Sequence, residues 1–329
     1  MTPLVRRAAA VLALLALTLL AACTTPPPAE PRPTVTYVLP VPSTSAAPTP
    51  TPTPEPVDPL GDGAVNALLI GTDSRTAGDL TGNADTILLV HVPADRQQVY
   101  LVSFTRDMWV TIPGLGEGKI NSAFSRGGTQ TLVDTVSGML GGVDVDFTVQ
   151  TTFDGFIALT RVLDGFEVDN KHRSTVTVQS TGRVVDFPEG RITLSGTDGL
   201  IYVRERKRLP WGDLDRTERQ RAALIGMMDK VAEVADDPVR LAEVLGYVVG
   251  NVKITGALAP GDVVSLVPLL KDLTRDDVVG LMVPITGFGS VDGASVNVVD
   301  AERTAALGQA LRDDDMAGYV ATYGTDYAP

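Results

Sequence analysis

The globular part of the chain begins near residue 63, where short apolar runs alternate with turns. Runs of β-branched and aliphatic residues are typical of strands buried on both faces, and they occur at 65–70, 86–92, 99–104 and 278–284. Apolar residues at helical spacing predict helices at 129–140, 153–163, 217–234, 241–249 and 261–270. Strands mixed with helices predict an α/β (α+β layered) domain over residues 63–315, with a central mixed β-sheet flanked by helices and a C-terminal tail at 316–329.

The N-terminus has the pattern of an exported protein. Arg6 and Arg7 precede an apolar run at 8–22, which is shorter than the about 20 residues that a membrane-spanning helix needs. We therefore predict a signal peptide at 1–22. The single cysteine of the chain, Cys23, follows Leu-Ala-Ala in a pattern that resembles a bacterial lipobox, which predicts lipidation of Cys23. A short signal anchor with an incidental cysteine is the alternative.

A spacer separates this end from the domain. Residues 23–62 contain 13 of the 23 prolines, together with many threonines, which predicts a disordered linker. Proline-rich chains extend by ~3.1 Å per residue, so the linker can hold a domain on the order of 100 Å from its anchor. We expect an extracytoplasmic protein that is anchored to the outer face of the cell membrane.

Composition narrows the chemistry. The formal net charge of −13 argues against nucleic acid as a partner, because binding a phosphate backbone needs a broad cationic surface. One cysteine and two histidines exclude an internal disulfide and make a Cys/His zinc site implausible. Oxygen-ligand and phosphate chemistry remain open.

Two aspartates lie at the ends of neighbouring predicted strands. Asp73 follows the first strand, and Asp85 comes directly before the second. Mg²⁺ is usually held by one or two carboxylates, with water and phosphate oxygens as its other ligands, so this pair is sufficient for a metal site. Aspartates that form turns or cap helices are an equally good interpretation of the spacing alone.

Cations gather in one segment of this acidic chain. Residues 204–221 carry seven Lys and Arg against four Asp and Glu. Arg216 and Gln220 are four residues apart and so share a helix face, and guanidinium groups suit phosphate oxygens. A solvated network of ion pairs is the alternative. Arg106 and Asp107 end the third strand, and Lys119 follows a glycine-rich turn that lacks the residues of a phosphate loop.

Six short motifs together resemble the LytR-CpsA-Psr family. The similarity spans about residues 64–230 and continues more weakly to about residue 312. The motifs occur in order as Asn66 to Arg75, Ala84-Asp85-Thr86, Ser103 to Asp107, Lys119-Ile120-Asn121, Tyr202 to Arg206 and Asp215 to Gln220.

The resemblance implies a Mg²⁺-dependent phosphotransferase, with Mn²⁺ as a possible substitute. Members move a glycopolymer from a polyprenyl-pyrophosphate carrier to peptidoglycan, and their sheet and helices enclose the lipid tail in a hydrophobic tunnel. It also implies roles for individual residues. Asp73 and Asp85 would hold the metal, and Asp73, Asp85, Arg106 and Asp107 would be catalytic. The pyrophosphate oxygens would be bound by Arg75, Arg106, Lys119, Arg204, Arg206, Arg216 and Gln220.

The chain departs from the family pattern at two positions. Asn83 stands where members commonly have an arginine, and Thr105 stands in place of the usual proline before Arg106. The general base is not identified by sequence; Asp107 or a metal-side aspartate is the hypothesis. Two other functions stay open, namely a polyprenyl-pyrophosphate pyrophosphatase and a non-catalytic envelope lipid-binding or regulatory protein.

Overall fold

The fold is described from a computed structural model at residues 60–74, 81–256 and 273–326. The predicted signal peptide, Cys23, most of the linker and the helix predicted at 261–270 lie outside these residues.

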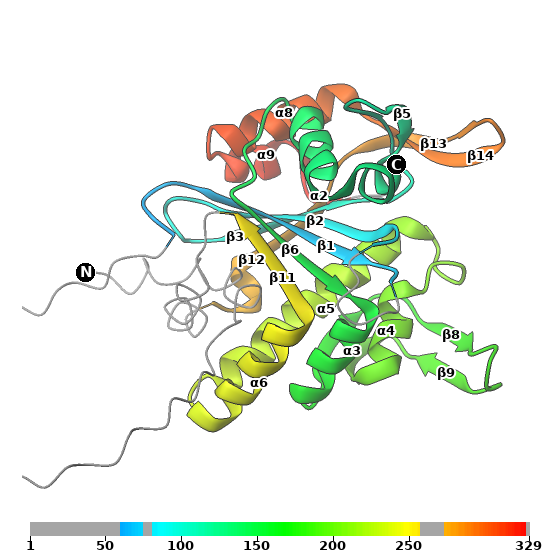
Figure 1. Ribbon diagram of the computed structural model, residues 1–329, viewed down its shortest axis with the longest axis vertical. Helices are drawn as coiled ribbons and strands as arrows, with labels where there is room; N and C mark the ends of the chain where they lie inside the picture. The colour runs from blue at the N-terminus through cyan, green and yellow to red at the C-terminus, as the bar shows by residue number, and fades with distance from the viewer. Residues whose placement is uncertain (1–59, 75–80, 257–272, 327–329) are drawn as a thin grey trace, which may run out of the picture.

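A six-stranded sheet forms the centre of the domain (Figure 1). Its order is β11-β6-β1-β2-β3-β12. The sheet is mixed, as predicted, because β1 pairs parallel with β6 and antiparallel with β2, and β12 pairs parallel with β3. The bounds are β1 Val65–Thr72, β2 Ala84–Val92, β3 Val99–Phe104, β6 Phe147–Thr152, β11 Val252–Gly256 and β12 Val278–Met282.

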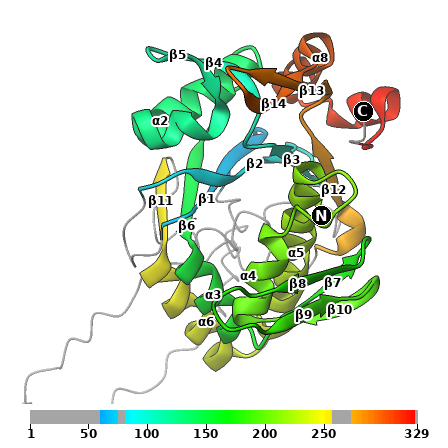
Figure 2. The same cartoon turned by 90° about the vertical axis from the view of Figure 1, so that its right-hand side faces the viewer.

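Helices cover both faces of the sheet, which makes a three-layered domain (Figures 1 and 2). Side chains alternate along β1, so Ala67 and Leu69 pack in one core with α3 to α6, while Leu68 and Ile70 pack in a second core with α2, α8 and α9. The two cores explain why the strands are apolar on both faces. The helices are α2 Ile120–Met139, α3 Phe153–Val162, α4 Gly196–Arg204, α5 Asp213–Val234, α6 Pro238–Asn251, α8 Ala301–Arg312 and α9 Met316–Tyr323, with a 3₁₀ turn η2 at Arg275–Asp277.

Four two-stranded sheets complete the described structure, three of them hairpins and the fourth, β7–β10, enclosing the β8–β9 hairpin in the sequence. Two of them, β4–β5 and β13–β14, lie beside α2 and α8, and the other two extend below α5 (Figure 2). These sheets were not predicted. They are β4 Trp109–Ile112 with β5 Gly116–Lys119, β7 Phe166–Asn170 with β10 Gly190–Leu194, β8 Ser174–Thr177 with β9 Val184–Phe187, and β13 Ile285–Val291 with β14 Ala294–Val299.

The predicted elements match the structure best where the apolar runs are long. The strands predicted at 65–70, 86–92, 99–104 and 278–284 are β1, β2, β3 and β12. The helix predicted at 129–140 is only the second half of α2, because Gly128 breaks the helix with φ 77°.

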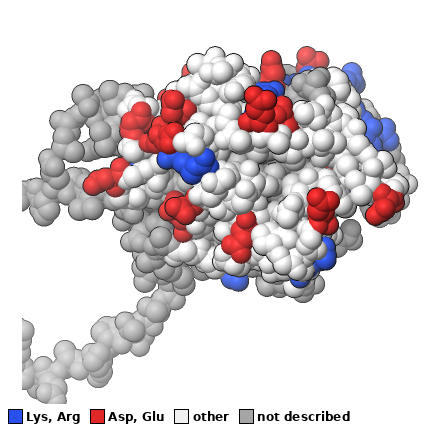
Figure 3. Space-filling model, turned by 90° about the horizontal axis from the view of Figure 1, so that it is seen from above, with Lys and Arg blue, Asp and Glu red and all other residues white. Residues whose placement is uncertain are grey.

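Among the described helices, none combines the length and the apolar character that crossing a membrane requires. On the face covered by α2 and α8, the described Lys and Arg side chains are scattered among Asp and Glu (Figure 3).

The folded domain extends past the boundary predicted at residue 315. The segment expected to be a tail begins with α9, in which Met316 and Tyr319 are buried in the same core as α2. The turn before α9 is tied to the sheet by Asp314, whose Oδ1 lies 3.1 Å from Nε2 of His91 and whose Oδ2 accepts a hydrogen bond from the Ala94 amide. His91 is fully buried, so this contact anchors the C-terminal helices.

We expect Asp314→Gly to lower the free energy of unfolding by about 1–3 kcal/mol, because Nε2 of the buried His91 loses its carboxylate partner while Nδ1 keeps its contact with Asn66. Glycine is the suitable replacement because Asp314 has φ 57°, a conformation that strains other residues. Urea unfolding followed by circular dichroism measures the change. Asp313→Ala is the control, since Asp313 makes only an exposed side-chain contact with Gln309. Equal stabilities of the two variants would contradict the prediction.

Candidate active site

A β-bulge directs Asp85 into the domain. Gly71 pairs with Thr86 and Thr72 pairs with Ala84, so Asp85 has no partner on β1. A bulge of this kind turns a side chain away from the regular alternation of the strand. Asp85 is buried, and its Oδ1 lies 2.5 Å from Nη1 of Arg106. The second predicted aspartate therefore meets the arginine that follows β3.

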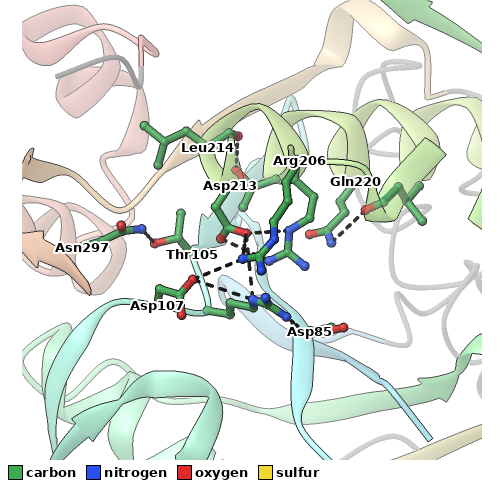
Figure 4. Close-up of polar contacts among 12 residues, drawn as sticks. Asp85, Thr105, Asp107, Arg206, Asp213, Leu214, Gln220 and Asn297 are labelled. Carbon is green, nitrogen blue, oxygen red and sulfur yellow. Dashed lines mark hydrogen bonds and ion pairs between the residues drawn. The ribbon is translucent and has the colours of Figure 1, made fainter. Parts of the chain in front are cut away.

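Asp107 brings together three of the predicted cations (Figure 4). Its Oδ1 accepts a hydrogen bond from Nζ of Lys119 at 2.6 Å. Its Oδ2 lies 3.6 Å from Nη1 of Arg206 and 3.8 Å from Nε of Arg106. Lys119 reaches this position because β5 pairs with β4, which places the Lys119 backbone opposite Trp109.

Asp213, at the start of α5, is a site residue that the sequence did not single out. Its Oδ1 lies 2.9 Å from Nε of Arg216, 3.9 Å from Arg206 and 4.0 Å from Arg106, and its Oδ2 accepts a hydrogen bond from Nη2 of Arg216. Figure 4 shows it among the guanidinium groups. In the sequence it was one of four anions in a basic segment, and an acidic residue in the first turn of a helix has an ordinary explanation in the helix dipole. The convergence of three arginines on it is visible only in three dimensions.

We call these side chains the charged network: Asp85, Asp107, Asp213, Arg106, Lys119, Arg206 and Arg216. Cations exceed carboxylates by one. Burial by itself lowers the pKa of Arg106, but the hydrogen bond and charge of Asp85, followed by the charges of Asp213 and Asp107, outweigh burial and raise that pKa. Arg106 is therefore a permanent cation.

Three buried atoms of the network lack an aligned hydrogen-bond partner. They are Nε of Arg106, Nε of Arg216 and Oδ1 of Asp213, although each lies within ion-pair distance of an opposite charge. Buried polar atoms are rarely left in this state. The two Nε groups have donor capacity that an anionic ligand can use.

A deep apolar cavity adjoins the network. It encloses about 990 Å³ of space unoccupied by atoms, part of it open to solvent, between the sheet and helices α3 to α5. Its walls are aliphatic and aromatic, with Leu88, Phe156, Leu159 and Leu224 among them. Its polar lining includes Asp85, Arg204, Arg216 and Gln220. The predicted pair Arg216 and Gln220 therefore shares the helix face that points into this cavity.

Arg204 and Gln220 lie in this lining outside the charged network. The guanidinium of Arg204 stacks over the ring of Phe153 at 4.3 Å, and Nε2 of Gln220 donates a hydrogen bond to the Val203 carbonyl at 3.4 Å. Both side chains are placed to contact a ligand that occupies the cavity mouth.

Known proteins resemble this chain in sequence and in fold. Residues 42–313 match the model of the LytR_cpsA_psr family. The chain belongs to this family. The LytR-CpsA-Psr-like fold that the motifs predicted is confirmed by solved structures: TagT bound to LIIa-WTA superimposes with a TM-score of 0.62 at 27% identity, over 78% of this chain and 92% of TagT.

Two curated relatives have related names. The cell wall biosynthesis protein LcpA of Corynebacterium glutamicum is 29% identical over 295 residues, which cover 75% of this chain and 55% of LcpA. The polyisoprenyl-teichoic acid--peptidoglycan teichoic acid transferase TagU of Bacillus subtilis is 35% identical over 189 residues, 57% of this chain and 58% of TagU. The chain thus spans just over half the length of these curated relatives.

Among the described residues, the carboxylate of Asp73, the first predicted metal ligand of this LytR-CpsA-Psr protein, contacts Asn83 and no side chain of the charged network. Its Oδ1 accepts a hydrogen bond from the Asn83 amide at 2.8 Å, and its Oδ2 accepts one from Nδ2 of Asn83 at 3.4 Å. Asn83, the departure from the family pattern, thus holds a carboxylate instead of supplying a cation. Arg75 lies outside the described residues. Within the described parts of the chain, no group of three or more His, Cys, Asp or Glu is placed to hold a metal.

The arginines of the basic segment 204–221 fall into two groups, one that packs α5 against its neighbours and one that belongs to the charged network. Arg219 lies 4.3 Å from the Tyr202 ring and donates a hydrogen bond to the His172 carbonyl, and Arg221 donates one to Oγ of Ser103. Both arginines are buried away from the network and hold α5 to its neighbours. Arg219 and Arg221 are therefore buried structural residues, which differs from the solvated network of ion pairs considered as the alternative, while Arg206 and Arg216 belong to the charged network.

Proposed function

We propose that this protein transfers a glycopolymer from a polyprenyl-pyrophosphate carrier to peptidoglycan. The observation that supports this most is the junction of an apolar cavity with a network of four cations, which fits a lipid tail joined to a diphosphate. The names of TagU and LcpA agree with it. Under this proposal the apolar cavity is the lipid tunnel.

The reaction is a phosphoryl transfer. A hydroxyl oxygen of the peptidoglycan sugar forms a bond to the phosphorus that carries the glycopolymer. The bond from that phosphorus to the bridging oxygen breaks, and polyprenyl phosphate leaves with the electron pair. Arg106, Arg206 and Arg216 offset the charge on the phosphate oxygens, which is the main demand of this chemistry. Asp107 is our candidate to accept the hydroxyl proton, because it faces the open polar side of the network.

We infer that Asp73 and Asp85 hold Mg²⁺, with Mn²⁺ as the alternative. The two residues suit the ion in chemistry, because both are hard carboxylate ligands. They also suit it in position, because each is the next residue after one member of a strand pair: Asp73 follows Thr72, and Asp85 follows Ala84, the partner of Thr72. Among the described residues, each oxygen of the two carboxylates accepts at most one hydrogen bond, so lone pairs remain for a cation. When bound, Mg²⁺ would neutralise charge on the pyrophosphate oxygens.

We also propose that lipidated Cys23 anchors the domain outside the cell membrane, within reach of the wall.

A reconstituted transfer assay tests the function. The full chain in detergent receives Mg²⁺, a polyprenyl-pyrophosphate glycan and a peptidoglycan oligomer, and mass spectrometry detects the products. We expect a phosphodiester between the two glycans, formed only with Asp73 and Asp85 intact. Phosphate release without that link identifies a pyrophosphatase. Donor binding without turnover identifies a non-catalytic lipid-binding protein, and either result contradicts the proposal.

We expect Leu159→Trp to weaken transfer from long-chain donors by about tenfold or more, because the indole fills cavity space that the lipid tail needs. Donors with a short isoprenoid should be affected far less. Kinetics with the two donors measure the ratio. Val184→Trp is the matched control, because Val184 is 62% exposed on β9 and lines no part of the cavity. An equal loss with both donors would refute a tail in this cavity.

A further inference from the structure

A second cavity opens on the other side of the charged network. It spans about 920 Å³ of space unoccupied by atoms, part of it open to solvent, and it shares Arg106, Asp107, Lys119, Arg206 and Asp213 with the network. The apolar cavity instead reaches the network at Asp85 and Arg216. Because Asp85 contacts Arg106 and Asp213 contacts Arg216, the two cavities meet across one layer of charged side chains. A diphosphate bound in that layer would have its lipid on one side and its other substituent on this side.

Two exposed aromatic side chains flank this second cavity. Trp211 is 42% exposed and Phe288 is 53% exposed, and both line it. Large exposed aromatic surface on a folded domain often marks a binding site. Lys207 and Ser295, which are also exposed in the cavity wall, supply hydrogen-bonding groups beside the two rings. Flat apolar faces beside polar groups match a sugar ring, which has C–H faces and a rim of hydroxyls.

The structure ties Phe288 to the loop that follows β3. Phe288 pairs across the β13–β14 hairpin with Asn297, so the two share one face. Nδ2 of Asn297 donates a hydrogen bond to Oγ1 of Thr105 at 2.6 Å, and its backbone amide donates one to the Asp107 carbonyl at 2.9 Å (Figure 4). The acceptors of these two hydrogen bonds, Thr105 and Asp107, are the residues on either side of Arg106 in the chain. The hairpin therefore holds its aromatic ring at a set position relative to the reacting groups.

Trp211 is held by the loop that precedes α5. Its backbone amide donates a hydrogen bond to Oδ2 of Asp215 at 2.7 Å, and it lies two residues before Asp213. Gly212, between them, has φ 57° and lets the chain turn directly into α5. One ring thus stands on the loop before α5, and the other stands on the hairpin beside the β3 loop.

We propose that this cavity is a glycan subsite, in which Trp211 and Phe288 stack on a sugar next to the scissile phosphate. The proposal rests on the proposed function, and it adds the residues that recognise carbohydrate. The sugar comes either from the donor, next to the pyrophosphate, or from the peptidoglycan acceptor. The chemistry of recognition is the same in both cases.

Binding is tested first, without turnover. A Trp109→Phe background leaves Trp211 as the single tryptophan of the full chain, so its fluorescence reports ligands in this cavity. We expect a lipid-free peptidoglycan oligomer, or the sugar-bearing donor but not bare polyprenyl pyrophosphate, to change that fluorescence. Phe288→Ala should weaken the binding by about threefold to tenfold. This binding measurement tests the glycan subsite whether or not the protein is a transferase.

Steady-state kinetics then identify the source of the sugar. If the acceptor occupies the cavity, Trp211→Ala and Phe288→Ala raise the KM for peptidoglycan and leave the KM for the donor unchanged. If the donor sugar occupies it, the same variants raise the KM for the sugar-bearing donor. Tyr247→Ala is the control, because Tyr247 is 48% exposed on α6 and lines neither cavity. The subsite is overturned if both aromatic variants bind glycan and react as Tyr247→Ala does.

Discussion

Replacing Arg106 with alanine is expected to lower the rate of glycopolymer transfer by about 10²- to 10³-fold. Arg106 contacts Asp85 at 2.5 Å and lies within 4.0 Å of both Asp107 and Asp213, so it is the cation common to all three carboxylates. Its removal leaves the pyrophosphate oxygens and the neighbouring carboxylates facing one another with less positive charge between them. The transfer assay with saturating donor measures the loss.

A loss of folding must be separated from a loss of chemistry. Arg106→Ala also leaves the buried Asp85 without its partner, which we expect to lower the free energy of unfolding by about 2 kcal/mol. The double variant with Asp85→Ala should regain most of that stability and none of the activity. Arg173→Ala is the matched control, because Arg173 is 68% exposed in its side chain and pairs with Asp186 on the β8–β9 hairpin. Transfer by Arg106→Ala at the rate of this control would remove Arg106 from the mechanism.

Asp213→Ala is expected to lower the free energy of unfolding by about 3–5 kcal/mol. The side chain of Arg216 is only 2% exposed, and Asp213 is the carboxylate that pairs with it in the charged network. Truncating Asp213 therefore leaves a buried guanidinium without a counter-charge. Guanidinium-chloride unfolding measures the effect, and the added variant Arg216→Met should recover much of the loss.

The same variant tests whether the network binds diphosphate. Inorganic pyrophosphate can replace the lost carboxylate as the counter-charge of Arg216, so it should raise the melting temperature of Asp213→Ala more than that of the parent protein. Asp236→Ala, at an exposed position after α5, serves as the control. A stability equal to that of the parent, or no response to pyrophosphate, would show that Asp213 does not organise the site.

The sequence predicted the parts of the fold that have long apolar repeats. β1, β2 and β3 are buried on both faces and therefore appear as continuous apolar runs. The hairpins were missed because strands of four to seven residues with exposed alternate positions lack such a run. The first half of α2 was missed because Ser125, Arg126 and Gly127 interrupt its apolar pattern before the break at Gly128. The tail predicted from 316 was in fact helical because Met316 and Tyr319 pack on a distant core.

The structure brings some of the predicted site residues together and leaves others apart. Asp85, Arg106, Asp107, Lys119, Arg206 and Arg216 form one network, while Asp73 is held by Asn83. Local spacing cannot reveal a β-bulge, and the bulge is what turns Asp85 towards Arg106. It also cannot rank Arg216 above Arg219, since the two are neighbours in one helix that face different partners.

The amino-acid sequence by itself determined the layered fold class, the family and most of the charged residues of the site, because these depend on residue type and short-range order. Only the tertiary structure decided which charges share a site, that Asp213 is central to it, and that Trp211 and Phe288 line one cavity beside it. The physical reason is that ion pairing and stacking act through space over a few ångströms, between segments that are up to about 200 residues apart in the chain.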